Sequence, residues 1–160
     1  MVKAKAVKQK KTEEGKVSRF IVNKNNTVED QKTGLIIIQD PTLLGDAFKS
    51  TITFDAAVKA IQDLNKQGYA GYNDWRLPSV EELCGMVDRT KQDPCYDTNI
   101  FKGKFNNWYW SGETCAWNPT GAAWCVNSNG GDVYGGSRGY GNYVRPVRSS
   151  QCQFDPLLVR

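Results

Sequence analysis

Apolar residues fall into short runs along the first part of the chain, separated by polar turns. Phe20-Ile21-Val22 and the run from Gly34 to Ile38 have the composition of strands, and Asp40-Pro41 closes the second run. The segment between the two runs is polar apart from Val28 and predicts a turn region. We therefore expect two short strands before residue 41.

Two segments with the apolar spacing of helices follow. Thr53 is a suitable N-cap for the first helix, and Gly68 is the residue type that ends a helix. The second helix begins at Ser79, because Ser79 and Glu82 have the spacing of a capping box. The predicted buried faces are Phe54, Ala57, Val58, Ile61 and Leu64 in the first helix, and Val80, Leu83, Cys84 and Val87 in the second.

The second half of the chain has strand composition in three places. After a loop over residues 90–107, strands are predicted at Trp108-Tyr109-Trp110, Ala123–Val126 and Tyr143–Arg148. Two helices followed by a run of short strands predict an α+β domain. We expect one domain over residues 17–150, with a disordered basic tail at 1–16 and a C-terminal tail at 151–160.

Residues 128–142, SNGGDVYGGSRGYGN, consist almost wholly of Gly, Ser, Asn, Asp and Tyr. This is the composition of an antigen-binding loop, in which Tyr provides large contacts with few torsions to fix and the small polar residues provide adaptable hydrogen bonds. The alternative is a flexible linker. Strand signals close on both sides favour an ordered binding surface.

Charge and composition exclude several classes of protein. The first 16 residues hold six Lys and two Glu, which accounts for the whole formal charge of +4, so the rest of the chain has no basic excess for nucleic acid. The sequence has no signal-peptide h-region and no apolar run of the ~18 residues that a membrane span needs. It also has no histidine, which excludes imidazole-based triads and zinc sites.

The cysteines leave alternatives open. Bridges between Cys115 and Cys125 and between Cys84 and Cys95 are possible, and so are reduced, partly buried thiols. No pair has CxxC spacing, and the odd number leaves at least one thiol free in a monomer. The full set is Cys84, Cys95, Cys115, Cys125 and Cys152.

Four segments resemble, in order, the motifs of a known family. Thr27–Leu35 is similar to its "TVxDxxTGL" opening, Tyr72–Ser79 to its "DWRLP" segment, Trp108–Ser111 to its "YWSS" strand and Tyr143–Arg148 to its closing "YVRPVR" strand. The family is that of C-type-lectin-like domains related to formylglycine-generating enzymes. It includes C-terminal domains of collagen-like bacterial adhesins and variable proteins diversified by retroelements. The resemblance implies a C-type lectin fold, with two helices packed on short, mostly antiparallel strands.

The resemblance to the diversified members implies a variable ligand-binding surface for a protein or glycan on a host or cell surface. Mutation at the adenines of AAY codons never yields Lys, Glu, Gln, Met or Trp, and residues 126–142 contain none of these five. The implied contact positions are Glu113, Thr114, Trp117, Asn118, Thr120, Ser128, Gly130, Asp132, Tyr134, Gly136, Ser137, Gly139 and Tyr140. The implied scaffold positions are Trp75, Arg76, Pro78, Trp110, Tyr143, Arg145 and Arg148.

Two other functions stay open. A glycan-binding adhesin domain would hold a sulfated polysaccharide through Arg138, Arg145 and Arg148, with binding that weakens as salt is added. An oxidase of the formylglycine-generating type would use Cys115 or Cys125. We expect no cofactor and no metal, since no compact acidic cluster has the spacing of a calcium site. The sequence does not fix the oligomeric state, and the resemblance implies a virion or cell surface as the location.

Overall fold

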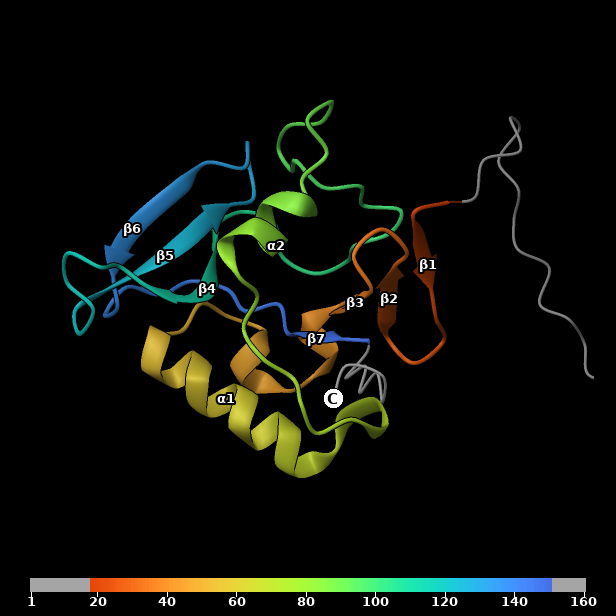
Figure 1. Cartoon of the computed structure of the whole chain (residues 1–160), viewed down its shortest axis with the longest axis horizontal. Coiled ribbons are helices and arrows are strands. Elements are labelled where there is room, and N and C mark those ends of the chain that lie inside the picture. The colour runs from red at the N-terminus through yellow and green to blue at the C-terminus, as the bar shows by residue number, and fades with distance from the viewer. Residues whose placement is uncertain (1–17, 151–160) are drawn as a thin grey trace, which may run out of the picture.

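Seven strands and two α-helices make up residues 18–150, the part of the chain that this computed structural model describes (Figure 1). The helices are α1 (Phe54–Gln67) and α2 (Val80–Gly85), and short 3₁₀ turns occupy Pro41–Leu43, Asp46–Phe48 and Tyr69–Gly71. The strands are β1 (Phe20–Val22), β2 (Thr27–Asp30), β3 (Leu35–Ile38), β4 (Trp108–Thr114), β5 (Ala122–Asn127), β6 (Val133–Ser137) and β7 (Val147–Ser149). The predicted α+β class is confirmed. The expected tails at 1–16 and 151–160 lie outside the described residues.

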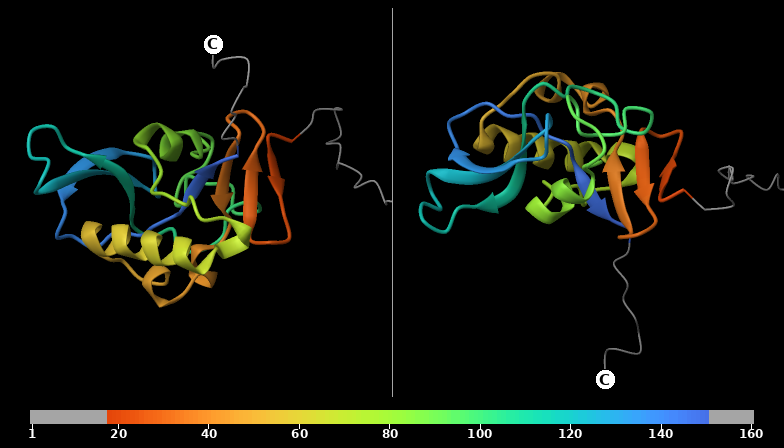
Figure 2. Two further views of the ribbon diagram at one scale, coloured as in Figure 1. Left: turned by 60° about the horizontal axis from the view of Figure 1, so that its bottom comes forward. Right: turned by 90° about the horizontal axis from the view of Figure 1, so that it is seen from above.

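The strands form two antiparallel sheets, ordered β1-β2-β3-β7 and β4-β5-β6. Figure 2 shows the two sheets at opposite ends of the molecule. Strand β3 is apolar along its whole length because both of its faces are buried. Ile36 and Ile38 belong to the core that α1 covers, whereas Leu35 and Ile37 belong to a second core that includes Leu83 of α2.

The predicted helix ends are confirmed. The Thr53 side chain accepts a hydrogen bond from the Ala56 amide, and Gly68 has the left-handed backbone conformation that favours glycine. Ser79 and Glu82 form the capping box at the start of α2. The predicted faces are only partly right: Val58 is 37% exposed, and Leu83 is the one fully buried residue of α2.

The predicted polar turn around Val28 is wrong, because Thr27–Asp30 forms strand β2 between β1 and β3. The strand buries Asp30, whose carboxylate accepts hydrogen bonds from Arg19 at 2.7 and 2.8 Å and from the Thr33 hydroxyl at 2.8 Å. A buried carboxylate with this many donors is satisfied within the protein. The polar composition of this segment therefore predicted an exposed turn where the protein has a buried strand.

Two further predictions need correction in the C-terminal half. Val133–Ser137, expected as part of a loop, forms strand β6 and pairs with β5 along its whole length. The closing segment is less regular than predicted, because β7 begins only at Val147. Before it, the Tyr143 amide donates to the Trp108 carbonyl at 2.8 Å and the Tyr143 carbonyl accepts from the Trp110 amide at 2.9 Å. Tyr143 therefore covers the outer edge of β4.

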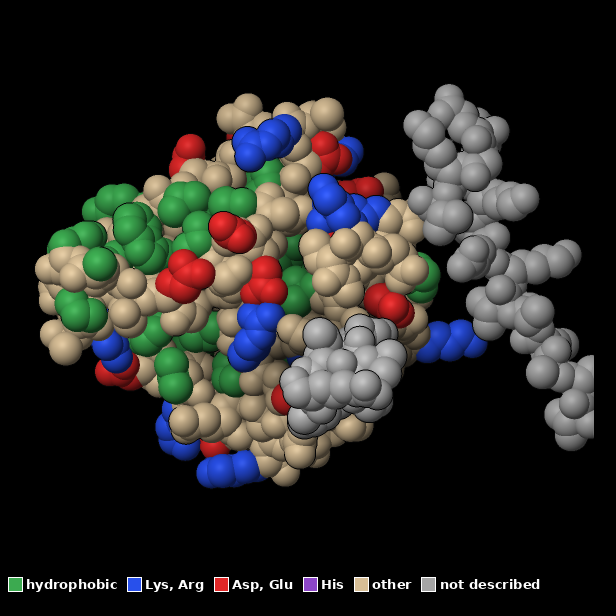
Figure 3. Space-filling view, viewed as in Figure 1, with side chains coloured by type: hydrophobic (Ala, Val, Ile, Leu, Met, Phe, Trp, Pro, Cys, Tyr) green, Lys and Arg blue, Asp and Glu red, His purple; other side chains and the backbone are tan. Residues whose placement is uncertain are grey.

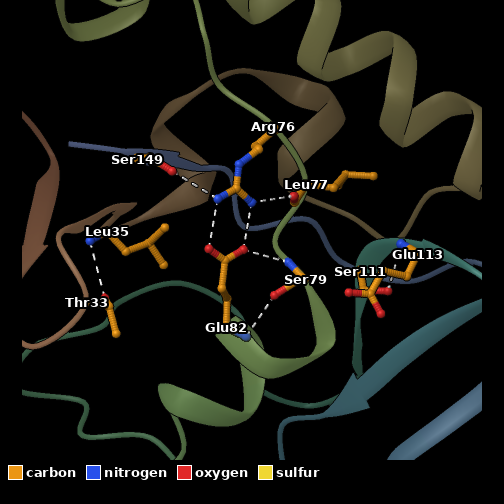
Figure 4. A network of polar contacts seen from close by, with 9 residues as sticks. All are labelled: Thr33, Leu35, Arg76, Leu77, Ser79, Glu82, Ser111, Glu113 and Ser149. Carbon is orange, nitrogen blue, oxygen red and sulfur yellow. Dashed lines mark hydrogen bonds and ion pairs between the residues drawn. The ribbon is translucent and has the colours of Figure 1, made fainter. Parts of the chain in front are cut away.

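An ion-pair network joins the segment before α2 to the rest of the domain (Figure 4). Arg76 donates to both carboxylate oxygens of Glu82, at 2.6 and 2.8 Å, and to the Ser149 hydroxyl at 3.3 Å. The same Glu82 carboxylate accepts from the Ser79 amide at 2.8 Å. Glu82 thus caps α2 and fixes Arg76, which also pairs through its backbone with Val147 of β7.

Candidate functional site

The β4-β5-β6 sheet positions most of the predicted contact residues, and its register assigns them to faces. Trp110, Cys125 and Tyr134 form one cross-strand row, and Ala123 lies opposite Gly136. Because side chains alternate along a strand, Tyr134 and Gly136 point to the same face. On this same face of the sheet, Trp110 and Cys125 pack in the core that α1 covers.

A hollow of about 210 Å³ opens on this face at the β6 side. Its lining is aromatic and uncharged, and consists of Trp108, Cys125, Tyr134, Gly136, Tyr140 and Asn142. We call this the aromatic hollow. Three of its members, Tyr134, Gly136 and Tyr140, are predicted contact positions. Gly136 forms part of the floor between the two tyrosines, since a Cβ built there would lie 3.4 Å from the Tyr134 ring and 3.7 Å from the Tyr140 ring.

The opposite face of β6 is packed more tightly. A Cβ on Gly135 would lie 2.9 Å from the Cys115 sulfur and 3.4 Å from the rings of Trp117 and Trp124. That distance to sulfur is shorter than Cβ contacts in proteins, so position 135 requires glycine for space. The two adjacent glycines therefore differ: Gly135 has no space for a Cβ, whereas Gly136 accommodates one at ordinary contact distances.

The upstream group of predicted positions lies at the end of the sheet where β6 terminates. Arg138, directly after β6, joins the two loops there: its amide donates to the Gly121 carbonyl at 2.9 Å and its guanidinium to the Pro119 carbonyl at 3.2 Å. Trp117, in the β4–β5 loop, is 67% exposed. The positions that share this end are Glu113, Thr114, Trp117, Asn118, Thr120, Ser137, Gly139 and Tyr140.

The remaining predicted positions do not join this group. Ser128, Gly130 and Asp132 lie in the β5–β6 turn, at the far end of a six-residue strand, which is a separation of about 17–20 Å. Ser128 is also fully buried, and its hydroxyl donates to the Asn107 carbonyl at 2.5 Å, so it does not face the surface as expected. Gly136 is buried as well, as part of the hollow's floor.

Exposed apolar side chains concentrate on the same sheet. Figure 3 shows hydrophobic side chains gathered at the end of the molecule where Figure 1 draws β5 and β6. Seven large hydrophobic residues are exposed within residues 18–150. Val133, Tyr134 and Tyr140 belong to β6 or the loop after it, and Trp117 of the β4–β5 loop lies beside Gly135 of β6. Clustered apolar exposure of this kind marks an interaction surface more often than scattered single residues do.

Sequence reasoning missed three residues of the hollow: Trp108, Cys125 and Asn142. Trp108 was expected as a strand residue, Cys125 as a strand residue with a candidate thiol, and Asn142 as the end of a loop; none was expected to contact a ligand. One sequence signal could have identified Trp108. Residues two apart on a strand point to the same face, so Trp108 lies on the same face as Trp110. The cross-strand neighbours of these residues follow from the register, which the sequence did not provide.

The four cysteines within the described residues are free thiols, so neither Cys115–Cys125 nor Cys84–Cys95 is bridged; Cys152 lies outside those residues. Cys115 and Cys125 are both buried. Burial raises the pKa of the Cys125 thiol to about 11, and the pKa of Cys115 is raised for the same reason. A nucleophilic cysteine needs a lowered pKa and an accessible position. Both thiols have the properties of packing residues.

The three arginines expected to hold a sulfated polysaccharide do not form a basic surface. Arg145 is 2% exposed and donates to the backbone carbonyls of Ile38, Gln39 and Lys102 at 2.7–2.8 Å. Arg148 forms an ion pair with Asp74 at 2.7 Å, and Arg138 forms one with Asp55. The burial of Arg145 agrees with its implied scaffold role. It does not agree with a glycan contact, which would require an exposed guanidinium.

The fold and this surface define a mostly-sheet α+β domain with an aromatic hollow open to solvent. A family model described as the Lcl C-terminal domain matches residues 26–148, and the chain belongs to this family. The match includes all four of the motif segments and agrees, at the level of the family, with the resemblance to adhesin C-terminal domains. A search of curated proteins finds no match. Among the helices of residues 18–150, none is long and apolar enough to cross a membrane.

Proposed function

We propose that this protein is a binding domain, not an enzyme, and that it recognises a partner through the aromatic hollow and the exposed rings beside it. The observation that carries the proposal is the hollow itself, an uncharged recess walled by Trp108, Tyr134 and Tyr140. Rigid aromatic side chains bind at little entropic cost, and central aromatic anchors supply much of the affinity of protein interfaces. The buried thiols with raised pKa values give no support to the oxidase alternative.

We also propose that the domain has a C-type lectin fold and is a variable protein of a diversity-generating retroelement. The ordered motifs from Thr27 to Arg148 support the fold, and the absence of Lys, Glu, Gln, Met and Trp from residues 126–142 supports the diversification. The space at the two glycines of β6 agrees with the diversification. Gly136, an implied variable position, accommodates a Cβ, whereas Gly135, which is not one, does not.

The glycan-binding alternative keeps the same surface but a different chemistry. Aromatic rings also stack on sugars, and the hollow offers them. Sulfated polysaccharides require a basic surface, however, and residues 108–142 contain a single basic residue, Arg138, which is paired with Asp55. We therefore favour an uncharged ligand group, such as an apolar side chain of a protein.

The test is selection of binders followed by titration. The full chain is panned against a displayed random-peptide library and against arrayed sulfated and neutral glycans. Selected binders are then titrated against the Tyr134→Ala/Tyr140→Ala double variant and against Leu43→Ala, which removes an apolar side chain that is 65% exposed in the Pro41–Leu43 turn. The hollow predicts selected peptides that lose at least about tenfold in affinity with the double variant and none with Leu43→Ala.

Equal affinity for the double variant and the wild type would contradict the proposal. Binding only to sulfated glycans, with a steep fall as salt is added, would establish the alternative in its place. Thermal unfolding serves as the control for folding, and we expect the double variant to unfold within a degree or two of the wild type, since both tyrosines are more than half exposed.

A further inference from the structure

The floor of the aromatic hollow includes a side-chain amide. The walls are aromatic rings, and the members of the lining that are buried, Cys125, Gly136 and Asn142, form the floor. Of these three residues, Asn142 carries the strong hydrogen-bonding group, because a thiol is a weak partner and glycine has no side chain. Asn142 is 5% exposed. The hollow therefore places a polar group at the bottom of an otherwise apolar recess.

The backbone of Asn142 is fixed, whereas its side chain has no strong partner. The Asn142 amide N–H donates to the Ile52 carbonyl at 3.0 Å, and its carbonyl accepts from the Ile52 amide at 2.9 Å. The Ile52 carbonyl also accepts from the Trp110 indole at 2.8 Å. Within residues 18–150 the side-chain amide of Asn142 makes no hydrogen bond with another nitrogen or oxygen. The Cys125 thiol lies beside it, but that thiol donates its own proton to the Tyr134 carbonyl at 3.3 Å.

The side-chain amide of Asn142 opens into the hollow. Among the described residues, Nε of Arg138 is the one fully buried side-chain nitrogen or oxygen without a hydrogen bond. The unpaired oxygen and nitrogen of the Asn142 side chain are therefore not fully buried, although the residue as a whole is. Because Asn142 lines the hollow, these atoms are reached from it. A ligand that covers them without a hydrogen bond loses the free energy of their hydration.

We propose that the hollow binds a tyrosine side chain of a protein partner, with the ring between the aromatic walls and the hydroxyl at the Asn142 amide. This inference rests on the proposed function and names the ligand group. A phenol hydroxyl donates one hydrogen bond and accepts another, so it can satisfy both the oxygen and the nitrogen of the amide. The volume of about 210 Å³ admits one such ring, since an apolar cavity of about 150 Å³ accommodates benzene.

Other uncharged groups match this floor less well. A phenylalanine ring leaves the Asn142 amide unpaired, and an indole N–H is a donor only, so it satisfies the amide oxygen alone. A pyranose carries hydroxyls around its ring, and two of the three residues in the floor, Cys125 and Gly136, offer them no strong side-chain partner. One ring with one hydroxyl is therefore the group that the hollow fits.

The experiment compares two soluble probes that differ by one hydroxyl, N-acetyl-tyrosinamide and N-acetyl-phenylalaninamide. Each is titrated into the full chain while the indole N–H of Trp108 is followed by two-dimensional NMR. We expect the wild type to bind the tyrosine probe about tenfold more tightly. Asn142→Leu keeps a side chain of similar size but removes the amide, so the preference should disappear or reverse, because the hydroxyl then has no partner in the floor.

Two further variants keep the comparison sharp. Asn129→Leu is the matched control, because it makes the same replacement at an exposed asparagine in the β5–β6 turn, and it should keep the tenfold preference. Asn142→Ala removes the amide without adding a branched side chain and should lose the preference as Asn142→Leu does. Both Asn142 variants retain the backbone groups that pair with Ile52, and thermal unfolding checks that each variant folds.

Failure of this inference is distinguishable from failure of the proposed function. If both probes bind the wild type equally and both are lost with Tyr134→Ala, the hollow is a binding site and the tyrosine assignment is overturned. A preference that survives in both Asn142 variants overturns it too, as does tighter binding of N-acetyl-tryptophanamide or methyl glucoside. If no probe binds at millimolar concentration, the hollow is not a binding site and both proposals are overturned.

Discussion

The indole of Trp108 and the ring of Tyr134 lie with their centroids 5.7 Å apart and their planes tilted by 50°. The two residues come from the outer strands of the three-stranded sheet, and Cys125 of the middle strand lies below them in the lining of the hollow. A small residue on the middle strand lets two rings from the outer strands approach each other. One wall of the hollow thus comes from a motif strand and the other from the segment implied to vary.

A small aromatic molecule should bind in the hollow. An apolar cavity of about 150 Å³ accommodates benzene, so a recess of about 210 Å³ that opens to solvent should hold p-cresol weakly. We expect a Kd in the millimolar range, about −4 kcal/mol, measured by two-dimensional NMR titration of the Trp108 indole N–H. Tyr134→Ala should abolish the shift. Val133→Ala, on the opposite face of the same strand, should leave it unchanged, and loss of binding in both variants would contradict the assignment.

Neighbouring glycines of β6 should respond differently to alanine. Gly135→Ala places a methyl group 2.9 Å from the Cys115 sulfur and should destabilise the fold by about 1–3 kcal/mol, the usual cost of overpacking. Gly136→Ala meets only ordinary contacts at 3.4–3.7 Å and should change the free energy of unfolding by less than about 0.5 kcal/mol. Urea denaturation measures both. Equal costs for the two variants would mean that the space at β6 is not as described.

The sequence predicted the helices better than the strands, because helix ends are specified locally. Thr53, Gly68 and the Ser79–Glu82 pair each act within four residues, and all of them were predicted correctly. Strand β2 was missed because its burial depends on Arg19, a partner eleven residues away that neutralises Asp30. Strand β6 was missed because glycines are typical of a loop, whereas Gly135 is required by the side chains of Cys115 and Trp124, which pack against it.

The candidate site was predicted in part. Tyr134, Gly136 and Tyr140 do lie together in one hollow, but Trp108, Cys125 and Asn142 complete it through contacts that only the register defines. Ser128 could not be distinguished from its exposed neighbours, since its burial depends on the distant Asn107 carbonyl. Local composition therefore identified the segment, and long-range packing decided which of its residues face solvent.

Arg145 should be essential for stability. Its guanidinium donates to three backbone carbonyls and lies 5.4–5.7 Å from the ring centroids of Phe101, Phe105 and Tyr109. Arg145→Met keeps much of the apolar stem but leaves buried carbonyls without donors, so we expect a loss of about 3 kcal/mol or more in urea denaturation. Arg89→Met, at an exposed position, should change stability by less than about 0.5 kcal/mol. A loss below about 1 kcal/mol for Arg145→Met would show that water replaces the guanidinium.

The ion pair between Arg76 and Glu82 should make stability depend on pH in the acid range. The hydrogen bonds from Arg76 lower the pKa of Glu82 below its usual value of 4.5, against the opposing effect of burial. A carboxyl group whose pKa is lower in the folded state stabilises the fold above its unfolded pKa, and this stabilisation is lost as pH falls through the folded pKa. Glu82→Gln retains an acceptor for the Ser79 amide but removes the charge, so it should lose about 0.5–1 kcal/mol at pH 7.

The difference between Glu82→Gln and the wild type should therefore shrink as urea denaturation is repeated from pH 7 down to pH 3. Glu81→Gln is the matched control, because Glu81 is exposed in the same helical turn and forms no ion pair or side-chain hydrogen bond within residues 18–150. It should show no such convergence beyond the small effect of a charge near the helix N-terminus. A constant difference for Glu82→Gln across this range would show that the Arg76 pair contributes through its geometry and not through the carboxylate charge.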